Sequence, residues 1–330
     1  MNQAMETNED EGKKSEAKKE SFKTIMTQKL FQVYFEIMKE RNTDSNFAAI
    51  LIIVTFVQLY GLLYYSRVEF PFRDDLYDTI AGICDLMRIY PMLEESRSGT
   101  YYWALAYTLI FILAAYIVQL IYVDYSIRIQ KFYFNFPVKL LQYLSSFVFW
   151  IMLQPIVEIF ISIYSCDSDG YHKVDATLKC WSSGLHIYYI ILFTISLLLY
   201  IVIAILVSFF YNESRPYYTD ALARLDCNFE LYLTLYRVFV SIIGHFFTHY
   251  DLQWVLVGMH LLGSANFCKM YLKYLPYYNV NTSVIFGAGW FSYFWISLNL
   301  LLTKALENVQ YEGQTIVIII GLVLVLPATK

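Results

Sequence analysis

Long runs of apolar residues are the feature that most restricts what this chain can fold into. The run 186–210 contains no charged residue and no Gly or Pro over its whole length. The hydrocarbon core of a bilayer is about 30 Å thick, and about 20 helical residues cross it. The chain is 58% hydrophobic and only 16% charged, whereas a soluble domain has about 25% charged residues. The sequence therefore predicts an integral membrane protein.

The apolar runs predict the fold class. Transmembrane helices are expected at 47–65, 101–123, 140–164, 186–210, 231–247, 252–268 and 284–302. An eighth run, 315–329, is apolar but would be only about 22 Å long as a helix, so it spans, re-enters or belongs to a shortened chain. We predict an all-α, polytopic helical membrane protein with seven or eight transmembrane helices within residues 46–330.

Residues 1–45 are expected to form a cytosolic N-terminal tail. Residues 1–21 mix acids and lysines without an aromatic residue, a composition that cannot bury a core. In 22–39 apolar residues recur at three- and four-residue steps, which indicates an amphipathic helix. Two interpretations stay open: the helix lies along the membrane surface, or it packs on a soluble partner domain.

Lys and Arg set the expected orientation. They are more frequent in the tail and in the connections on its side of the membrane than in 66–100 and 165–185. Because basic loops stay cytoplasmic, the N-terminus is predicted to be cytosolic, in a plasma membrane or an endomembrane.

Two cysteines bracket the connection 165–185. Cys166 and Cys180 fall on the predicted outer side, where an oxidising compartment permits a disulfide. A zinc site formed by these cysteines and His172 is the alternative, but its spacing matches no common zinc finger. We predict the disulfide and no metal.

A few ionisable residues lie inside the predicted spans. From the helix rise, Glu158, His245 and His260 share one layer in the outer half of the membrane, at about 27, 21 and 18 Å from the inner face. Pro155, one turn away, is expected to loosen the helix that carries Glu158. The layer is either a proton or cation path or a satisfied hydrogen-bond cluster between helices. Arg237 lies only about 9 Å deep, so its side chain is predicted to reach the cytoplasmic rim.

Catalytic motifs are scarce. His245 and His249 form an H-x-x-x-H pair, but di-iron membrane hydroxylases need several such pairs and this chain has five histidines in all. Zinc-protease, phosphate-loop and nucleophile-elbow motifs are missing from the sequence. We predict no enzyme, no cofactor and no nucleic-acid partner.

In the predicted cytosolic connection 211–230, the segment 220–226, which follows Pro216, consists largely of residues that favour a helix. In one interpretation this segment is a coupling helix that transmits motion of the span 231–247 to a cytosolic partner. In the other, its apolar face simply docks on neighbouring loops. The residues concerned are Asp220, Leu222, Arg224, Leu225, Asp226 and Phe229.

The order of several segments resembles a known family. The Cys166–Cys180 loop, the long span from His186, the segments 210–216 and 220–226, and the Leu-Lys-Tyr-Leu-Pro-Tyr-Tyr run at 272–278 look like the membrane region of the protist family related to tiny macrocysts protein B. The resemblance covers about 130–330. It implies a sensory or signalling role with cytosolic PAS-type or repeat domains in longer members, and it carries no catalytic residues.

Two functions follow as expectations. The first is the transmembrane module of a sensory or signalling protein, with the lipid bilayer and a cytosolic signalling domain or protein as partners. The alternative is a transporter or channel with a polar layer around Glu158, His245 and His260. A transporter is expected to contain broken helices around a site at the membrane midplane, and a receptor-like module a packed bundle with a cytosolic coupling surface.

Overall fold

A computed structural model describes residues 33–34, 45–65, 82, 88–129, 136–182, 184–210, 221–224, 228–247 and 253–305. The principal elements are α2 (Ser45–Tyr65), α4 (Tyr90–Ser96), α5 (Gly99–Ile129), α6 (Phe136–Ser146), the π-helical turn η1 (Phe147–Ile151), α7 (Leu153–Ile161), the 3₁₀ turn η2 (Ser162–Tyr164), α8 (Gly184–Phe210), α9 (Asn228–Phe247), α10 (Gln253–Tyr274) and α11 (Val280–Ala305). Within these residues only isolated β-bridges occur and no strand. The described part is therefore all-helical.

The seven predicted runs from 47–65 to 284–302 overlap helices, but fewer of these helices meet the criteria for a membrane span. The short helix α4 lies in 66–100, which was predicted to be an outer connection. Four of the described helices, α2, α5, α8 and α11, are long and apolar enough to cross a membrane. The bent pair 136–151 and 153–164 brings the number to five if it counts as one span. The chain is thus a helical protein of membrane type, and the expected seven or eight spans are not confirmed. The run 315–329 lies outside the described residues.

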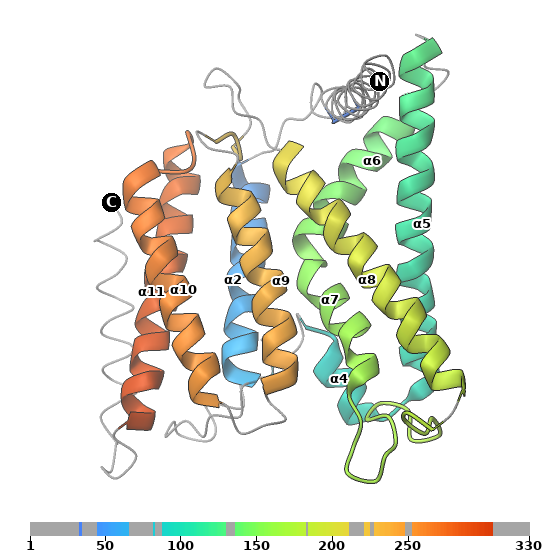
Figure 1. Ribbon diagram of the computed structural model, residues 1–330. Coiled ribbons are helices and arrows are strands. Elements are labelled where there is room, and N and C mark those ends of the chain that lie inside the picture. The colour runs from blue at the N-terminus through green and yellow to red at the C-terminus, as the bar shows by residue number, and fades with distance from the viewer. Residues whose placement is uncertain are drawn as a thin grey trace, which may run out of the picture.

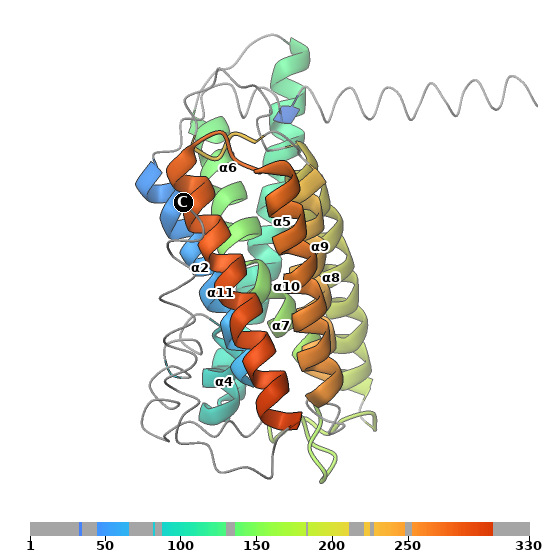
Figure 2. The ribbon, with the colours of Figure 1, turned by 90° about the vertical axis from the view of Figure 1, so that its left-hand side faces the viewer.

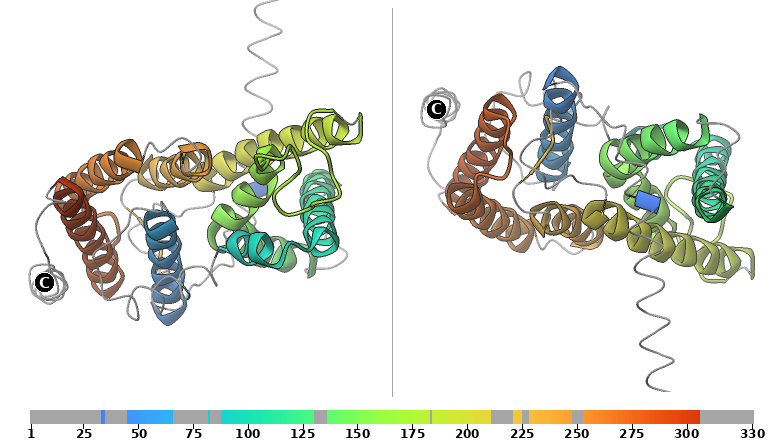
Figure 3. Two further views of the ribbon diagram at one scale, coloured as in Figure 1. Left: turned by 90° about the horizontal axis from the view of Figure 1, so that it is seen from below. Right: turned by 90° about the horizontal axis from the view of Figure 1, so that it is seen from above.

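Two helix bundles lie side by side. One core joins α4, α5, α6, η1, α7 and α8, and the other joins α2, α10 and α11. The helix α9 contributes Val238 to the first core and Leu233 and Val240 to the second, and we count it with the second bundle. Figure 3, which looks along the helices, shows the two groups meeting where α8 lies next to α9. At the same boundary α7 packs on α9, and η1 packs on α2. Figure 2 shows the long helices running in nearly the same direction. The helices α4 to α8 of the first bundle follow one another in sequence, whereas the second bundle is assembled from helices on both sides of them.

Aromatic side chains fill the core of the second bundle. Phe267 of α10 stacks on Trp290 of α11 with ring centroids 4.2 Å apart, and Phe56 of α2 meets Trp290 edge-on at 5.2 Å. Gly289 lets α2 and α11 approach, since a Cβ atom there would lie 2.1 Å from the ring of Phe56. Small residues at helix crossings serve this purpose in membrane proteins.

The helix from Phe136 to Ile161 is broken near its middle. The axes on either side of Met152 differ by 63°. Pro155 explains the break in part, because its nitrogen carries no hydrogen and cannot donate to the carbonyl of Ile151 one turn earlier. The π-helical turn η1 directly precedes the break. Backbone carbonyls at the junction consequently lack a backbone N–H donor and can accept hydrogen bonds from side chains.

The N-terminal amphipathic segment is described only at Val33 and Tyr34. Both residues are helical and both are buried in the core of the first bundle. These two side chains therefore pack on the protein. The rest of the predicted segment 22–39 lies outside the described residues.

Candidate functional site

Buried polar side chains line the boundary between the two bundles. We call this group the polar seam and define it by Gln58 of α2, Arg88 before α4, Trp150 of η1, Gln154 and Glu158 of α7, and Arg237 of α9. None of these six residues is more than 6% exposed. Polar groups at this depth are costly unless they are hydrogen-bonded, so their mutual contacts determine what the seam can do.

An ion pair forms one part of the seam. Arg88 Nε donates to Glu158 Oε1 at 3.0 Å and to Oε2 at 3.2 Å. Arg88 Nη1 donates to the carbonyl of Gly61 in α2 at 3.0 Å, so the guanidinium connects the two bundles. The next residue, Ile89, has a φ of 65°. A β-branched residue is rarely found in this left-handed region, and such strain persists only where surrounding contacts enforce it.

Side chains from the second bundle bind the exposed carbonyls of the helix break. Gln58 Nε2 donates to the carbonyl of Ile151 at 2.6 Å, which replaces the donor that Pro155 lacks. Arg237 Nη1 donates to the carbonyl of Trp150 at 3.1 Å, and its Nη2 donates to Gln58 Oε1 at 2.6 Å. The break is thus stabilised from α2 and α9.

Gln154 joins these contacts to the ion pair. Its Nε2 donates to the carbonyl of Gln58 at 2.9 Å and lies 3.5 Å from Glu158 Oε1. Trp150 extends the seam in the other direction, since its Nε1 donates to Thr55 Oγ1 at 3.2 Å. A chain of polar contacts therefore runs along the boundary from Arg88 to Arg237.

The position of Arg237 corrects the sequence prediction. Its side chain does not reach the cytoplasmic rim, because the residue is 1% exposed and its guanidinium points to Trp150 and Gln58. The helix break supplies the carbonyl of Trp150 as a hydrogen-bond acceptor inside the protein, so the Arg237 guanidinium is hydrogen-bonded there and does not extend to the membrane–water interface. Depth along an ideal straight helix could not reveal this.

The predicted layer of Glu158, His245 and His260 has a different arrangement. Each residue is buried, but each has its own polar partner. Glu158 pairs with Arg88, a ring nitrogen of His245 lies within hydrogen-bond distance of Ser165 Oγ, and His260 Nδ1 contacts the hydroxyl of Tyr293. His245 also packs edge-on against Tyr90, two residues from Arg88. Only Glu158 belongs to the polar seam.

The predicted coupling helix is wrong where the structure describes it. Residues 221–224 form a turn that ends in a β-bridge between Arg224 and Tyr277, not a helix. Leu222 is 1% exposed, and Phe229, at the start of α9, packs edge-on against Phe267 and Phe286. The segment is docked on the bundle, as in the alternative interpretation. Asp220, Leu225 and Asp226 lie outside the described residues.

Arg224 anchors that turn at the upper end of the bundle in Figure 1. It is completely buried and forms an ion pair with Glu230 of α9. Its Nη2 donates to the hydroxyl of Tyr277 at 2.8 Å, and its guanidinium lies over the rings of Tyr277 and Trp150 at 4.6 and 5.2 Å. Because Trp150 also belongs to the polar seam, Arg224 connects the seam to this end.

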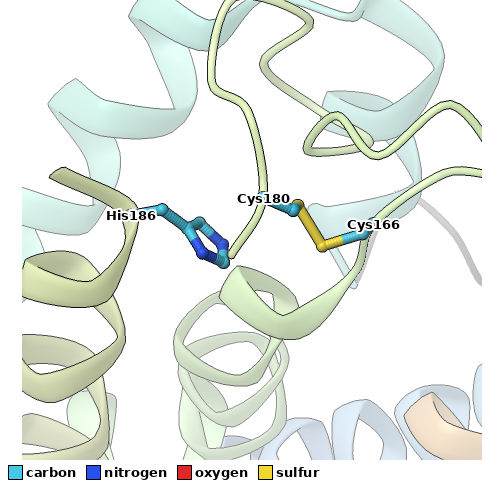
Figure 4. Close-up of side chains that lie close together, drawn as sticks. All are labelled: Cys166, Cys180 and His186. Atoms are coloured by element: carbon cyan, nitrogen blue, oxygen red, sulfur yellow. A yellow bond between two sulfur atoms is a disulfide. The ribbon is translucent and has the colours of Figure 1, made fainter. Parts of the chain in front are cut away.

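The Cys166–Cys180 loop lies at the other end of the bundle (Figure 1). The predicted disulfide is confirmed, and Figure 4 shows the imidazole of His186 beside it. Cys166, Cys180 and His186 offer ligand atoms within 4.8 Å of one another, but two sulfurs in a disulfide have no thiolate to give a metal ion. The predicted zinc alternative through His172 also fails, since both cysteines are consumed.

His172 stabilises this loop as a neutral imidazole. Its Nε2 lies 3.1 Å from the carbonyl of Ser162, and its Nδ1 accepts a hydrogen bond from the backbone N–H of Asp175 at 3.2 Å. Burial lowers the pKa of His172 to about 4. Trp103 Nε1 donates to Asp175 Oδ2 at 2.6 Å, which fastens the loop to α5.

Several seam residues were missed by sequence reasoning. Arg88 lies in a stretch that composition assigns to an outer loop. Gln58 and Gln154 interrupt apolar runs and could have been found by searching for any polar side chain inside a predicted span. The spacing of Gln154 gives a further signal, because Gln154 precedes Glu158 by one helical turn and the two side chains therefore lie on the same face of the helix.

Comparisons with known proteins do not identify a family or a function for the chain. No family model, no curated protein and no solved structure matches the chain. The resemblance to the family of tiny macrocysts protein B stays a prediction.

Proposed function

We propose that this chain moves a small ion across a membrane, as a transporter or channel, along the boundary between its two bundles. The observation that carries the proposal is the broken helix at Met152, whose free carbonyls are bound by Gln58 and Arg237 of the opposite bundle. Discontinuous helices near the bilayer midplane are a recurrent way to build an ion or substrate site.

The architecture supports this proposal in a second way. The two cores meet along a surface where α9 packs on α7 and α8 and where hydrogen bonds of the polar seam cross from α2 and α9 to the broken helix. The hydrogen bonds of the polar seam can exchange partners with an ion or with water, while apolar contacts keep the helices packed. Relative movement of two such bundles around a central site is a known mode of alternating access.

The proposal includes a topology. We place the N-terminus and the turn 221–224 in the cytosol and the disulfide-bonded loop outside, and we count α9 and α10 as spans besides the helices that pass the hydropathy criterion. The basic residues of the tail support this orientation. Arg237 and its neighbours reduce the apolar character of α9, as expected for a helix that faces a polar seam.

Ion flux in reconstituted vesicles tests the function. Purified protein in liposomes is expected to dissipate imposed gradients of protons, alkali cations or halides faster than protein-free liposomes. The variant Glu158→Gln should slow that flux by more than tenfold, whereas Asp124→Asn, on the exposed surface of α5, should not. Flux equal to that of empty liposomes for all three classes of ion would contradict the proposal.

Signalling is the second candidate. It is supported by the continuous chain of polar contacts that links Arg88 near one end of the bundle with Arg224 at the other. Such a chain can transmit a rearrangement without moving an ion. The family resemblance points the same way. Restored cellular signalling by a Glu158→Gln variant that no longer conducts would favour this function over transport.

A further inference from the structure

The buried charges of the described bundle do not balance. Arg88 is paired with Glu158, and Arg224 with Glu230. Arg237 is 1% exposed, yet no carboxylate of the described residues lies within 4.0 Å of its guanidinium. A buried charge that lacks a partner of opposite sign is strongly destabilising, and more so inside a membrane.

Neutral groups offset only part of this charge. The carbonyl of Trp150 and the amide oxygen of Gln58 each accept one hydrogen bond from Arg237. Glu230 interacts with Arg237 from two helical turns away, about 10 Å along the axis, but its carboxylate is engaged by Arg224. A net positive charge therefore remains where α2, η1 and α9 meet.

Two hydrogen-bond donors at this place have no partner among the described residues. They are Nε of Arg237 and the hydroxyl of Ser241, which is completely buried. Ser241 follows Arg237 by one turn of α9, so both side chains lie on the same face of the helix. An ordered water molecule could accept both hydrogen bonds but would bring no negative charge.

We propose that a small anion binds between Arg237 Nε and Ser241 Oγ. The anion accepts a charge-assisted hydrogen bond from the guanidinium and a second one from the hydroxyl. Both residues are shielded from solvent by the surrounding helices. The proposed ligand is therefore of halide size or is a single small carboxylate, because a larger anion would displace the packed side chains. Its role as the transported ion rests on the proposed function, whereas its binding does not.

Thermal unfolding in detergent tests the binding. Sodium gluconate is replaced stepwise by sodium chloride, sodium bromide or sodium formate at constant ionic strength. Tm of the wild-type protein should rise and then saturate, because a ligand of the folded state stabilises it by mass action. A response to formate but not to the halides would also support the site and would identify a carboxylate as its ligand.

Variants locate the site. Arg237→Gln should abolish the saturable rise of Tm, and Arg237→Lys should retain part of it. Ser241→Ala should shift the half-saturating concentration upward by about tenfold, as expected for one lost hydrogen bond to a charged group. If Arg237→Gln does not fold, the Ser241→Ala shift alone decides.

Two controls match these variants. Ser297→Ala removes another buried hydroxyl, which donates to the carbonyl of Tyr293 in its own helix. Arg128→Gln removes an arginine that pairs with Asp124 on the exposed surface of α5. Both should keep the wild-type anion dependence.

A wild-type Tm that is the same in gluconate, chloride, bromide and formate would overturn the inference, and so would an unchanged response of Ser241→Ala. Saturable binding without flux in liposomes would instead support the anion site and overturn the transport function. The two failures are therefore distinguishable.

Discussion

Arg88 Nε donates to both carboxylate oxygens of Glu158, and both residues are almost completely shielded from solvent. The same guanidinium reaches the carbonyl of Gly61 on the opposite bundle. A pair of this kind lacks the screening that weakens ion pairs in water, so the loss of one partner leaves the other as a buried charge.

The variant Glu158→Gln is therefore expected to lower the free energy of unfolding by about 3 kcal/mol, since it leaves Arg88 uncompensated. Chemical unfolding in detergent, followed by circular dichroism, measures the change. Asp124→Asn breaks the exposed Arg128–Asp124 pair and should cost less than about 1 kcal/mol. Equal losses in the two variants would mean that the seam pair is hydrated.

Removing the disulfide should destabilise the loop at the end of the bundle. Cys166 and Cys180 are 14 residues apart in sequence, and closing a loop of this length stabilises a fold by about 3 kcal/mol in the chain-entropy model. The double variant Cys166→Ser, Cys180→Ser should have a lower Tm than the wild type. Reductant should lower the Tm of the wild type and leave the double variant unchanged, which separates disulfide loss from other effects.

The neutral state of His172 predicts how stability depends on pH. Burial lowers the pKa of this imidazole from 6.5 to about 4. Between pH 6.5 and about pH 4, His172 is therefore protonated in the unfolded chain and neutral in the folded protein. The titration of His172 does not lower the free energy of unfolding above about pH 6.5. As the pH falls below this value the free energy of unfolding declines, and the loss reaches about 3 kcal/mol at pH 4. Unfolding measured from about pH 7.5 to about pH 4 should show the decline.

The variant His172→Gln serves as the control for that titration. Its stability should change less steeply over the same pH range, because the group that titrates is gone. Parallel curves for the two proteins would show that another group causes the decline.

A methyl group at Gly289 should separate two helices. Its carbon would lie 2.1 Å from the ring of Phe56, and such overpacking costs about 1–3 kcal/mol. At Gly258 of α10 a methyl group would meet no neighbouring atom within 4 Å, so Gly258→Ala should be neutral or stabilise the helix by up to about 1 kcal/mol. Thermal unfolding of the two variants compares them, and a similar Tm for both would argue against the α2–α11 contact.

Sequence predicted the helices well because hydrophobic length is a property of each segment alone. The run 186–210 forms most of α8, and the cysteines that bracket the preceding loop form the disulfide. Pro155 indicates a loosened helix, but neither the π-helical turn nor the sharp bend could be predicted from it. Both depend on acceptors and donors that come from other helices.

The polar partners were the least predictable part of the site. Depth along one helix places Arg237 at the membrane rim, but its partners come from α2 and η1, which are far away in sequence. The sequence identifies Glu158 as a buried polar residue, yet Arg88 reaches it from a stretch that composition alone assigns to a loop. Pairings of this kind arise from tertiary packing and carry no local signature.

The order of the helices has a consequence for how the molecule is made. The helices α4 to α8 of the first bundle follow one another in sequence, whereas α2 precedes them and α9 to α11 follow them. During synthesis, the contact between Phe56 of α2 and Trp290 of α11 cannot form until the ribosome has translated the whole segment between them. The face of α2 that packs on α11 in the folded protein consequently lacks this partner until almost all of the described residues have been synthesised.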